Sequence, residues 1–341
     1  MTRWLIIGSA AAALPGPLAV ALGDPAGVGP EIVAKAWERR GEAGLPPFFA
    51  VGSCDALKAV WGGPLVAISD PAEALTWFGD ALPVVRAGPS VMVSPGAPDL
   101  DGAHVALDSL ELAVGLTRGG AAAALVTGPV SKAQLYAVGF THPGQTEFVA
   151  ERCGVSSELV AMMLVGPTLR TVPVTVHLPL REVPDRLTVE RIVLKGRATA
   201  RGLQRQFGID NPRIAVSGLN PHAGENGALG REDQDVIVPA IERLRAEGIE
   251  ATGPYPADTM FHERARARYD AALCMFHDQA LVPIKTLHFD EGVNMTLGLP
   301  IVRTSPDHGT AFNIAGKDQA NPGAMIAAIQ TAAASARRIA A

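Results

Sequence analysis

Short apolar runs recur along the chain, and each is followed by glycine, proline or polar residues. The clearest are 18–22, 48–51, 125–127, 170–176, 213–217 and 271–276. Each is too short for a helix and suits a buried strand. Longer stretches with a helical pattern, such as 106–116 and 133–138, lie between them. This alternation predicts an α/β fold built on a largely parallel sheet.

The composition is that of a globular protein long enough for two domains. Of the 341 residues, 48% are hydrophobic and 18% are charged, which excludes a disordered chain. The net charge of −5 and the lack of a Lys/Arg run argue against nucleic acid as a partner. No apolar run reaches the length of a membrane span, so no membrane partner is expected.

The cysteines and the first residues indicate the cellular compartment. Cys54, Cys153 and Cys274 are far apart and odd in number, which fits a reducing, cytoplasmic environment and gives no support to a structural zinc knuckle. Residues 3–13 resemble a short secretory segment, but cleavage there would fall almost on the first predicted strand at 18–22. We therefore interpret them as an extended or misassigned start.

Histidines follow three of the predicted core strands. His177 comes after 170–176, His222 follows 213–217 and His277 follows 271–276. Ligands of open α/β sheets bind at the carboxyl ends of the strands, and imidazole is a common ligand of divalent metals. The pattern favours a metal site over three structural hydrogen bonds, with ligands from one subunit or from two. Asp258 and Asp278 are candidates to orient the imidazoles.

A second group of polar residues suits a phosphate. Thr146, Lys285, Asn294 and Arg303 offer two cations and two neutral hydrogen-bonding groups. Ordinary surface charge is the alternative for each one alone. The glycine-rich turn at 23–31 has neither the dinucleotide fingerprint nor a phosphate-loop motif, so a tight strand-to-helix connection is an equal alternative there.

Several motifs in consistent order resemble a known family. The segment from His308-Gly309-Thr310 to Asn321 resembles the adenosine-binding loop of the isocitrate and isopropylmalate dehydrogenases. The further motifs are GDPAGVGPE at 23–31, TGPVSK at 127–132, PGQTEF at 143–148, VHLPL at 176–180, GLNPHAGE at 218–225, PADT at 256–259, HDQ at 277–279 and GVNMTLGLP at 292–300. Together they resemble the 4-hydroxythreonine-4-phosphate dehydrogenases of pyridoxal phosphate biosynthesis.

The resemblance implies an architecture. We expect two α/β/α domains flanking a cleft, similar to isocitrate dehydrogenase. Residues 1–125 with 305–341 would form the nucleotide-binding domain, and 126–304 the metal, substrate and dimerisation domain. The resemblance also implies a homodimer whose partner completes each active site.

The resemblance implies an activity and assigns residues to it. The reaction is oxidation of the C3 hydroxyl of 4-phosphooxy-L-threonine by NAD or NADP, followed by decarboxylation to 3-amino-2-oxopropyl phosphate. The metal, which would be zinc, magnesium, cobalt or manganese, falls on His177, His222 and His277. The substrate contacts fall on Gln145, Thr146, Lys285, Asn294 and Arg303, and the nucleotide contacts on His308, Gly309, Thr310 and Asn313.

Two points stay open on these residues. The family usually has histidine where this chain has Gln145, which leaves room for a related substrate such as 4-phosphoerythronate or 4-phosphothreonate. Lys132 and Asp258 are both candidates for the general base. From other classes, the alternatives are a hydrolase or lyase that uses the three histidines with bound water, and a silent binding protein.

Overall fold

The computed structural model describes residues 13–341, and the described chain forms two compact units. Unit 1 is Gly154–Leu299, and unit 2 is 13–153 together with Pro300–Ala341. Sequence analysis placed the boundaries at 125/126 and 304/305, whereas the units divide at 153/154 and 299/300. Residues 126–153 thus lie with the first strands. The segment weighed as a leader falls mostly on residues 1–12, outside the described residues.

Unit 2 contains a parallel sheet with the strand order β3-β4-β2-β1-β5-β12. The strands are β1 (Leu18–Ala21), β2 (Phe48–Gly52), β3 (Leu65–Ile68), β4 (Leu82–Arg86), β5 (Leu125–Thr127) and β12 (Arg303–Pro306). In the register, Ala19 lies beside Phe49 on one side and beside Leu125 on the other. All four residues of β1 are buried, as expected for a central parallel strand covered on both faces.

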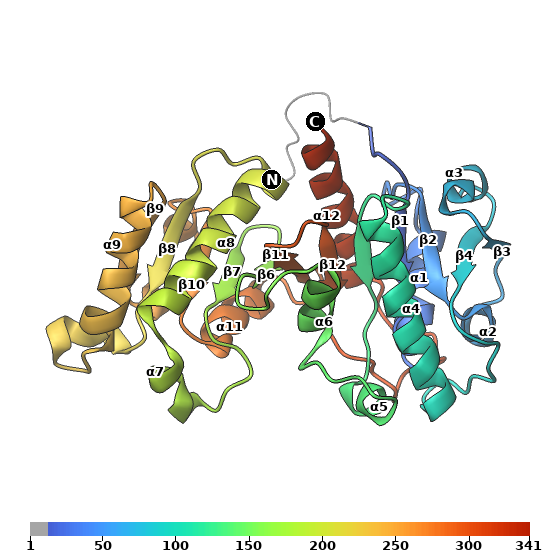
Figure 1. Ribbon diagram of the computed structural model, residues 1–341, viewed down its shortest axis with the longest axis horizontal. Helices are drawn as coiled ribbons and strands as arrows, with labels where there is room; N and C mark the ends of the chain where they lie inside the picture. Colours follow the sequence, from blue (N-terminus) through green and yellow to red (C-terminus); the bar gives the residue numbers. More distant parts are fainter. Residues whose placement is uncertain (1–12) are drawn as a thin grey trace. The chain divides into compact units, whose positions relative to one another are not determined.

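Helices cover both faces of this sheet (Figure 1). Helix α4 packs on β1, β2 and β5, while α12 packs on β12, β5 and β1 and also against α1. The helices are α1 (Gly29–Glu38), α2 (Cys54–Val60), α3 (Ala74–Trp77), α4 (Leu100–Arg118), α5 (Lys132–Ala137), α6 (Gln145–Arg152) and α12 (Gly323–Ala340), with a short η1 (Pro71–Glu73).

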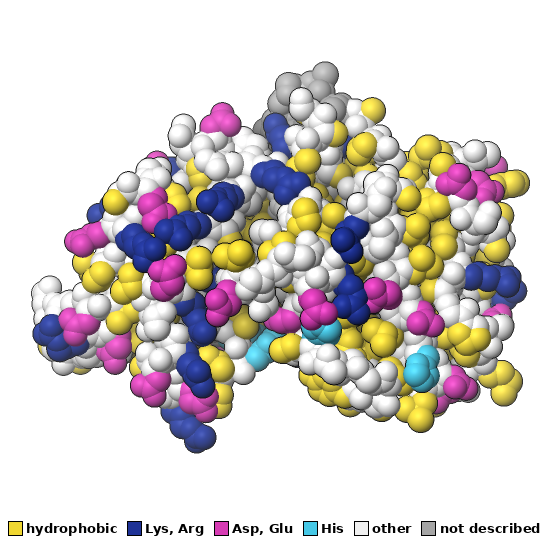
Figure 2. Space-filling model, in the orientation of Figure 1, with side chains coloured by type: hydrophobic (Ala, Val, Ile, Leu, Met, Phe, Trp, Pro, Cys, Tyr) yellow, Lys and Arg dark blue, Asp and Glu magenta, His cyan; other side chains and the backbone are white. Residues whose placement is uncertain are grey.

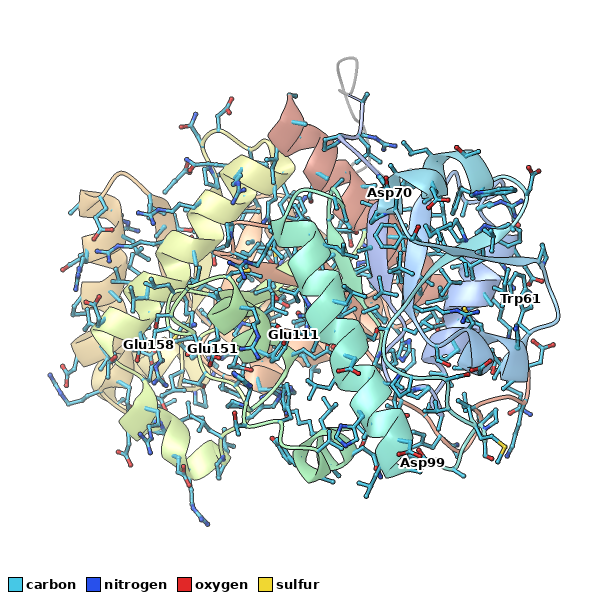
Figure 3. All side chains as sticks on the ribbon, turned by 45° about the vertical axis from the view of Figure 1, so that its right-hand side comes forward. Trp61, Asp70, Asp99, Glu111, Glu151 and Glu158 are labelled. Carbon is cyan, nitrogen blue, oxygen red and sulfur yellow. The ribbon has the colours of Figure 1, made fainter. Side chains whose placement is uncertain are left out.

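Polar side chains cap one of these helices and connect two of them. Asp99 accepts a hydrogen bond from the Gly102 amide at 2.7 Å and so begins α4 (Figure 3). Arg152 of α6 donates to Glu111 of α4 and to Glu151. Both carboxylates are labelled in Figure 3.

Unit 1 has a mixed sheet with the strand order β11-β6-β7-β10-β8-β9. The strands are β6 (Ala161–Val165), β7 (Arg170–Pro173), β8 (Arg213–Ser217), β9 (Glu250–Tyr255), β10 (Ala271–Cys274) and β11 (Val293–Leu297). β7, β10, β8 and β9 run parallel, whereas β6 is antiparallel to both β7 and β11. The three parallel strands that precede the histidines are therefore neighbours in this sheet.

The helices of unit 1 lie on this sheet in two groups. α8 packs on β6, β8, β10 and β11 and against α9, whereas α11 packs on β6, β7 and β10 over a core that includes Leu164, Cys274 and Ile284. The elements are α7 (Val183–Arg186), α8 (Val189–Phe207), α9 (Val238–Ala246), α10 (Glu263–Arg266) and α11 (His277–Leu287), with the short turns η2 (Leu180–Glu182), η3 (Pro221–Gly227), η4 (Asp233–Ile237) and η5 (Ala257–Thr259). The predicted α/β fold class is confirmed.

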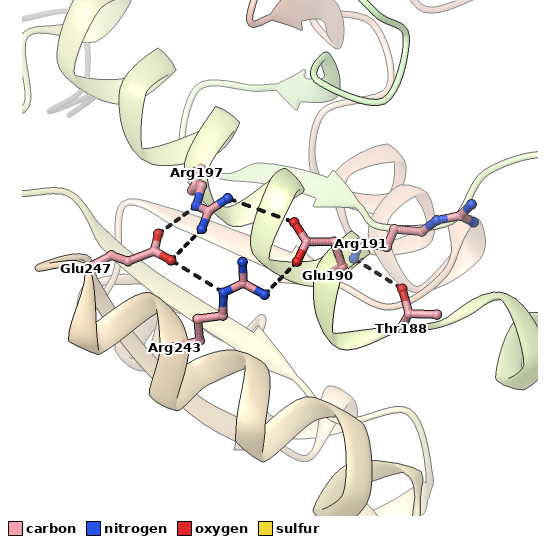
Figure 4. Close-up of polar contacts among 6 residues, drawn as sticks. All are labelled: Thr188, Glu190, Arg191, Arg197, Arg243 and Glu247. Atoms are coloured by element: carbon pink, nitrogen blue, oxygen red, sulfur yellow. Dashed lines mark hydrogen bonds and ion pairs between the residues drawn. The ribbon is translucent and has the colours of Figure 1, made fainter.

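Charged side chains connect α8 to α9 on the surface. Arg197 and Arg243 each contact both Glu190 and Glu247, which forms a closed network of alternating charge (Figure 4). On the face drawn in Figure 2, Lys and Arg side chains gather over these helices with Asp and Glu among them. Among residues 13–341, no helix is long and apolar enough to cross a bilayer.

Candidate active site

The three predicted metal ligands follow three adjacent parallel strands of unit 1. β7 ends four residues before His177, β8 ends five before His222, and β10 ends three before His277, which begins α11. Because parallel strands present their carboxyl ends at one edge, the fold places all three loops along that edge. His177 and His222 are exposed and His277 is half-buried.

Two of these imidazoles lie close together. The ring centroids of His177 and His277 are 5.8 Å apart, with an angle of 41° between the ring planes. Two imidazoles that bind one cation through nitrogens about 2 Å away have centroids roughly 5–6 Å apart, so this pair suits a shared metal. Among residues 13–341 no group of three or more His, Cys, Asp or Glu side chains could hold a metal. Within the described chain, the structure brings His177 and His277 together and does not add His222 to them as a third ligand.

His277 is oriented by its neighbour in the chain. The Nδ1 atom of His277 lies 2.7 Å from the Oδ1 atom of Asp278. A carboxylate on one ring nitrogen leaves the other nitrogen available as a ligand, which is the usual arrangement of metal-binding histidines. The chemistry of the donor set therefore fits a divalent cation.

His222 lies in a strained loop. Residues 222–226 all have positive φ, and four of them are not glycine. Such residues cost roughly 1–3 kcal/mol each and persist only where the surroundings hold them. Asp233, 1% exposed, accepts hydrogen bonds from the amides of Leu219 at 2.9 Å and Asn220 at 3.2 Å. η5, which carries the exposed Asp258, packs against this loop.

In unit 2 two of the predicted substrate residues, Gln145 and Thr146, contact a third, Arg303. Arg303 is 3% exposed, and its guanidinium donates from Nη2 to Thr127 Oγ1 at 2.8 Å and to Gln145 Oε1 at 3.2 Å. Nη1 donates to Thr146 Oγ1 at 3.4 Å. Burial lowers the pKa of Arg303 to about 10, while the charge of Glu147 acts in the opposite direction. A buried guanidinium beside hydroxyl and amide side chains is suited to an oxyanion.

Lys132 belongs to the same part of unit 2. It is exposed at the start of α5, and a Cβ atom built on Gly144 would lie 3.9 Å from its Nζ atom. Gly144 directly precedes Gln145, so Lys132 lies beside Arg303 and the residues that contact it.

The other two predicted substrate residues lie in unit 1. Lys285 is half-buried on α11, and Asn294 lies on β11 with a buried Oδ1 atom that accepts no hydrogen bond from the described residues.

The predicted nucleotide loop follows β12 and packs on the first turn of unit 2. The Thr310 carbonyl accepts a hydrogen bond from the Val28 amide at 2.9 Å, and Asn313 accepts one from Lys317 at 2.8 Å. His308 and Gly309 are exposed. Gly23, at φ 76°, lets this turn approach β5 closely, because a Cβ there would lie 2.3 Å from the Pro129 carbonyl oxygen.

Similarity to known proteins identifies the family of this chain. Residues 49–332 match the family described as "Pyridoxal phosphate biosynthetic protein PdxA". A 4-hydroxythreonine-4-phosphate dehydrogenase from Zymomonas mobilis is 58% identical, over 94% of this chain and 96% of that protein. The chain belongs to the PdxA family. The predicted resemblance is confirmed.

Solved structures agree with the PdxA assignment. A 4-hydroxythreonine-4-phosphate dehydrogenase from Klebsiella pneumoniae matches with a TM-score of 0.83 and 36% identity, over 94% of this chain and 98% of that chain. A terephthalate 1,2-cis-dihydrodiol dehydrogenase from Burkholderia xenovorans matches with a TM-score of 0.64 and 28% identity, over the same shares. The fold of this PdxA-family chain therefore also occurs in a protein named for a different substrate.

Sequence reasoning did not assign several residues that organise these sites. Glu31, 2% exposed, accepts hydrogen bonds from the amides of Gly316 at 3.0 Å and Ala320 at 3.1 Å, and so holds the end of the nucleotide loop. Asp24, 2% exposed, accepts one from the Ala26 amide at 3.1 Å, and burial raises its pKa. Both lie in the GDPAGVGPE motif, where an acidic residue between apolar neighbours is the available signal.

Proposed function

We propose that this PdxA-family protein oxidises the C3 hydroxyl of 4-phosphooxy-L-threonine with NAD(P)+. The product is a β-keto acid that loses CO2 to give 3-amino-2-oxopropyl phosphate. The observation that carries the proposal is the 58% identity, over nearly the whole chain, to a protein named 4-hydroxythreonine-4-phosphate dehydrogenase. The family description places the reaction in pyridoxal phosphate biosynthesis.

Arg303, Thr146 and Gln145 bind the phosphate in this proposal. Support comes from the burial of Arg303 and from the hydrogen bonds that its guanidinium makes to Thr127, Gln145 and Thr146. Lys285 and Asn294 are assigned as further substrate contacts. The buried Asn294 Oδ1 atom would accept a hydrogen bond from a substrate hydroxyl or ammonium group. Anchoring the phosphate places the carbinol carbon for reaction.

His177, His222 and His277 hold a divalent zinc, magnesium or cobalt ion. When bound, the cation supplies a Lewis acid for the oxygen on C3, and the oxidised nucleotide supplies the hydride acceptor. The closeness of the His177 and His277 rings and the Asp278 contact support these two ligands, whereas His222 is assigned from the resemblance alone. We also propose a homodimer in which the partner subunit completes each site.

His308, Gly309, Thr310 and Asn313 bind the nucleotide. Support comes from their position on one loop that is fixed to α1 by Glu31 and by the Val28 amide.

Two residues are candidates to take the proton from the C3 hydroxyl. Lys132 lies beside Gly144 and Arg303 in unit 2, whereas Asp258 lies beside the loop of His222 in unit 1. Comparing Lys132→Met with Asp258→Asn separates them. The base is the residue whose loss lowers kcat and removes the acidic limb of the pH profile, where the wild-type base becomes protonated, while substrate binding persists.

The function is tested by an assay of the full-length protein with a defined metal. The substrates are 4-phosphooxy-L-threonine, 4-phosphothreonate, 4-phosphoerythronate and unphosphorylated 4-hydroxythreonine, each with NAD+ and NADP+. We expect the highest kcat/KM for 4-phosphooxy-L-threonine, with one CO2 released per reduced nucleotide. A higher kcat/KM for either phosphorylated acid would identify that acid as the substrate. Turnover without nucleotide reduction would place the protein among hydrolases or lyases.

A further inference from the structure

We propose that Gln279 is a positioning residue that holds the loop of His222 in place relative to His277. The inference rests on the proposed function, because it concerns the side chains assigned to the metal. Gln279 is half-buried in the first turn of α11, two residues after His277.

The amide of Gln279 bonds to two strand ends at once. Its Oε1 atom accepts hydrogen bonds from Ser217 Oγ and from the Met275 amide, both at 2.7 Å. Its Nε2 atom donates to the Gly218 carbonyl oxygen at 2.8 Å. Ser217 and Gly218 begin the loop that carries His222, and Met275 precedes His277. One side chain therefore joins the two histidine segments.

These bonds begin where the backbone ladder stops. The pairing of β10 with β8 ends at Leu273 beside Val216. On the other side of β10, backbone hydrogen bonding extends beyond the ends of β7 and β10. The amides of Val174 and Thr175 donate to the carbonyls of Cys274 and Met275. Backbone bonds thus connect the His177 and His277 segments almost to the histidines. On the side toward β10, the His222 segment is joined at the corresponding level by the Gln279 side chain, while Asp233 and the Tyr255 carbonyl hold it from other sides.

The polarity of the partners requires an amide at this position. Two donors face Oε1 and one acceptor faces Nε2, so a carboxylate would bring an oxygen against the Gly218 carbonyl. An apolar side chain would leave the Met275 amide and the Gly218 carbonyl without this partner. Because residues 222–226 have strained φ angles, the loop needs such attachment to keep one conformation.

The test compares metal affinity with fold stability in the full-length protein. Gln279→Met and Gln279→Glu are measured with Co2+ and Zn2+ by equilibrium dialysis against a chelator and by the Co2+ absorption spectrum. We expect the Kd for metal to rise by about 10- to 100-fold in both variants, as found when a group supporting a metal ligand is removed. The Kd for nucleotide should not change. Ser217→Ala removes one of the three hydrogen bonds of Gln279 and should give a smaller rise in the Kd for metal. This variant tests the inference if the Gln279 variants do not fold.

Gln206→Met is the matched control. Gln206 is a buried glutamine of α8 in the same unit, and its Oε1 atom accepts no hydrogen bond from the described residues. This variant should leave metal affinity unchanged, whatever its effect on Tm. If the Gln279 variants also keep the wild-type Kd and spectrum, with or without a lower Tm, Gln279 is only a structural residue and the inference is wrong.

His222→Ala separates this inference from the proposed function. If the wild type binds metal, His222→Ala loses it and Gln279→Met retains it, only the positioning role is overturned. If the wild type binds neither ion, or if His222→Ala binds as tightly as the wild type, the metal site itself fails and the positioning role fails with it.

Discussion

Arg303 Nη2 donates a hydrogen bond to Oε1 of Gln145 over 3.2 Å, and the Nε2 atom of the same amide donates to the Gly128 carbonyl oxygen at 3.1 Å. Both ends of the Gln145 amide are therefore fixed by partners of opposite polarity. A neutral histidine could accept from Arg303 in the same way, but a protonated one could not. Glutamine at this position keeps the contact at every pH at which the protein is folded.

Gln145→His should make substrate binding depend on pH. As the pH falls through about 6.5, the imidazole becomes protonated, loses its contact with Arg303 and repels the guanidinium. We expect the ratio of the variant's KM to the wild-type KM to rise by several-fold as the pH falls from about 8 to about 6. Using the ratio removes the titration of the substrate phosphate itself. The exposed Gln204→His is the control, and a constant ratio in Gln145→His would contradict the assignment.

Arg303→Lys should weaken binding of the phosphorylated substrate. Lysine keeps the charge but loses the planar fork that reaches Thr127, Gln145 and Thr146 together. The loss of about 2 kcal/mol, typical of hydrogen bonds to charged groups, corresponds to a KM about 30-fold higher. The KM for nucleotide should stay within about two-fold. Arg243→Lys, in the surface network of Figure 4, is the control. Equal KM values for Arg303→Lys and wild type would show that the phosphate binds elsewhere.

Glu31→Gln should weaken nucleotide binding. The Glu31 carboxylate accepts from the amides of Gly316 and Ala320 and contacts Lys35 at 2.8 Å, whereas glutamine would direct an NH2 group at one of these donors. We expect the Kd for nucleotide, measured by titration calorimetry, to rise by about 5- to 20-fold, which corresponds to about 1–2 kcal/mol, the net contribution of roughly one hydrogen bond. Glu38→Gln, an exposed position of the same helix, should leave the Kd unchanged. An unchanged Kd in Glu31→Gln would separate this contact from nucleotide binding.

His288 should make stability depend on pH. Its Nε2 atom accepts a hydrogen bond from the Thr168 amide at 3.3 Å and lies 2.8 Å from Thr168 Oγ1, which requires the neutral ring, and burial lowers its pKa. Because its pKa in the folded state is below the ordinary value, the unfolded chain binds more protons as the pH falls through about 6.5. The stabilisation is therefore complete above that pH and is lost below it. In His288→Gln, the fall in Tm between about pH 7.5 and about pH 5.5 should be smaller than in wild type. An equal fall would show that other groups cause it.

The local pattern of the sequence was enough to locate most of the strands that carry the sites. The apolar runs at 18–22, 48–51, 125–127, 213–217 and 271–276 contain or overlap β1, β2, β5, β8 and β10. Burial acts on each short run separately, and turn residues end it, so this information is local. The run at 170–176 was predicted too long, because β7 ends at Pro173, although the amides of Val174 and Thr175 still bond to the chain after β10.

The tertiary structure alone decided which residues meet. Arg303 and Gln145 are 158 positions apart, and Glu31 is 285 positions from Gly316. No periodicity relates such residues, because strand order and the return of the chain after β11 place them together. The sequence by itself determined the elements, the family and the types of chemical group available. Only the packed sheets decided that Gln145 faces an arginine, that His177 lies beside His277, and that Gln279 connects two strand ends, since these contacts depend on long-range pairing that local hydrophobicity does not encode.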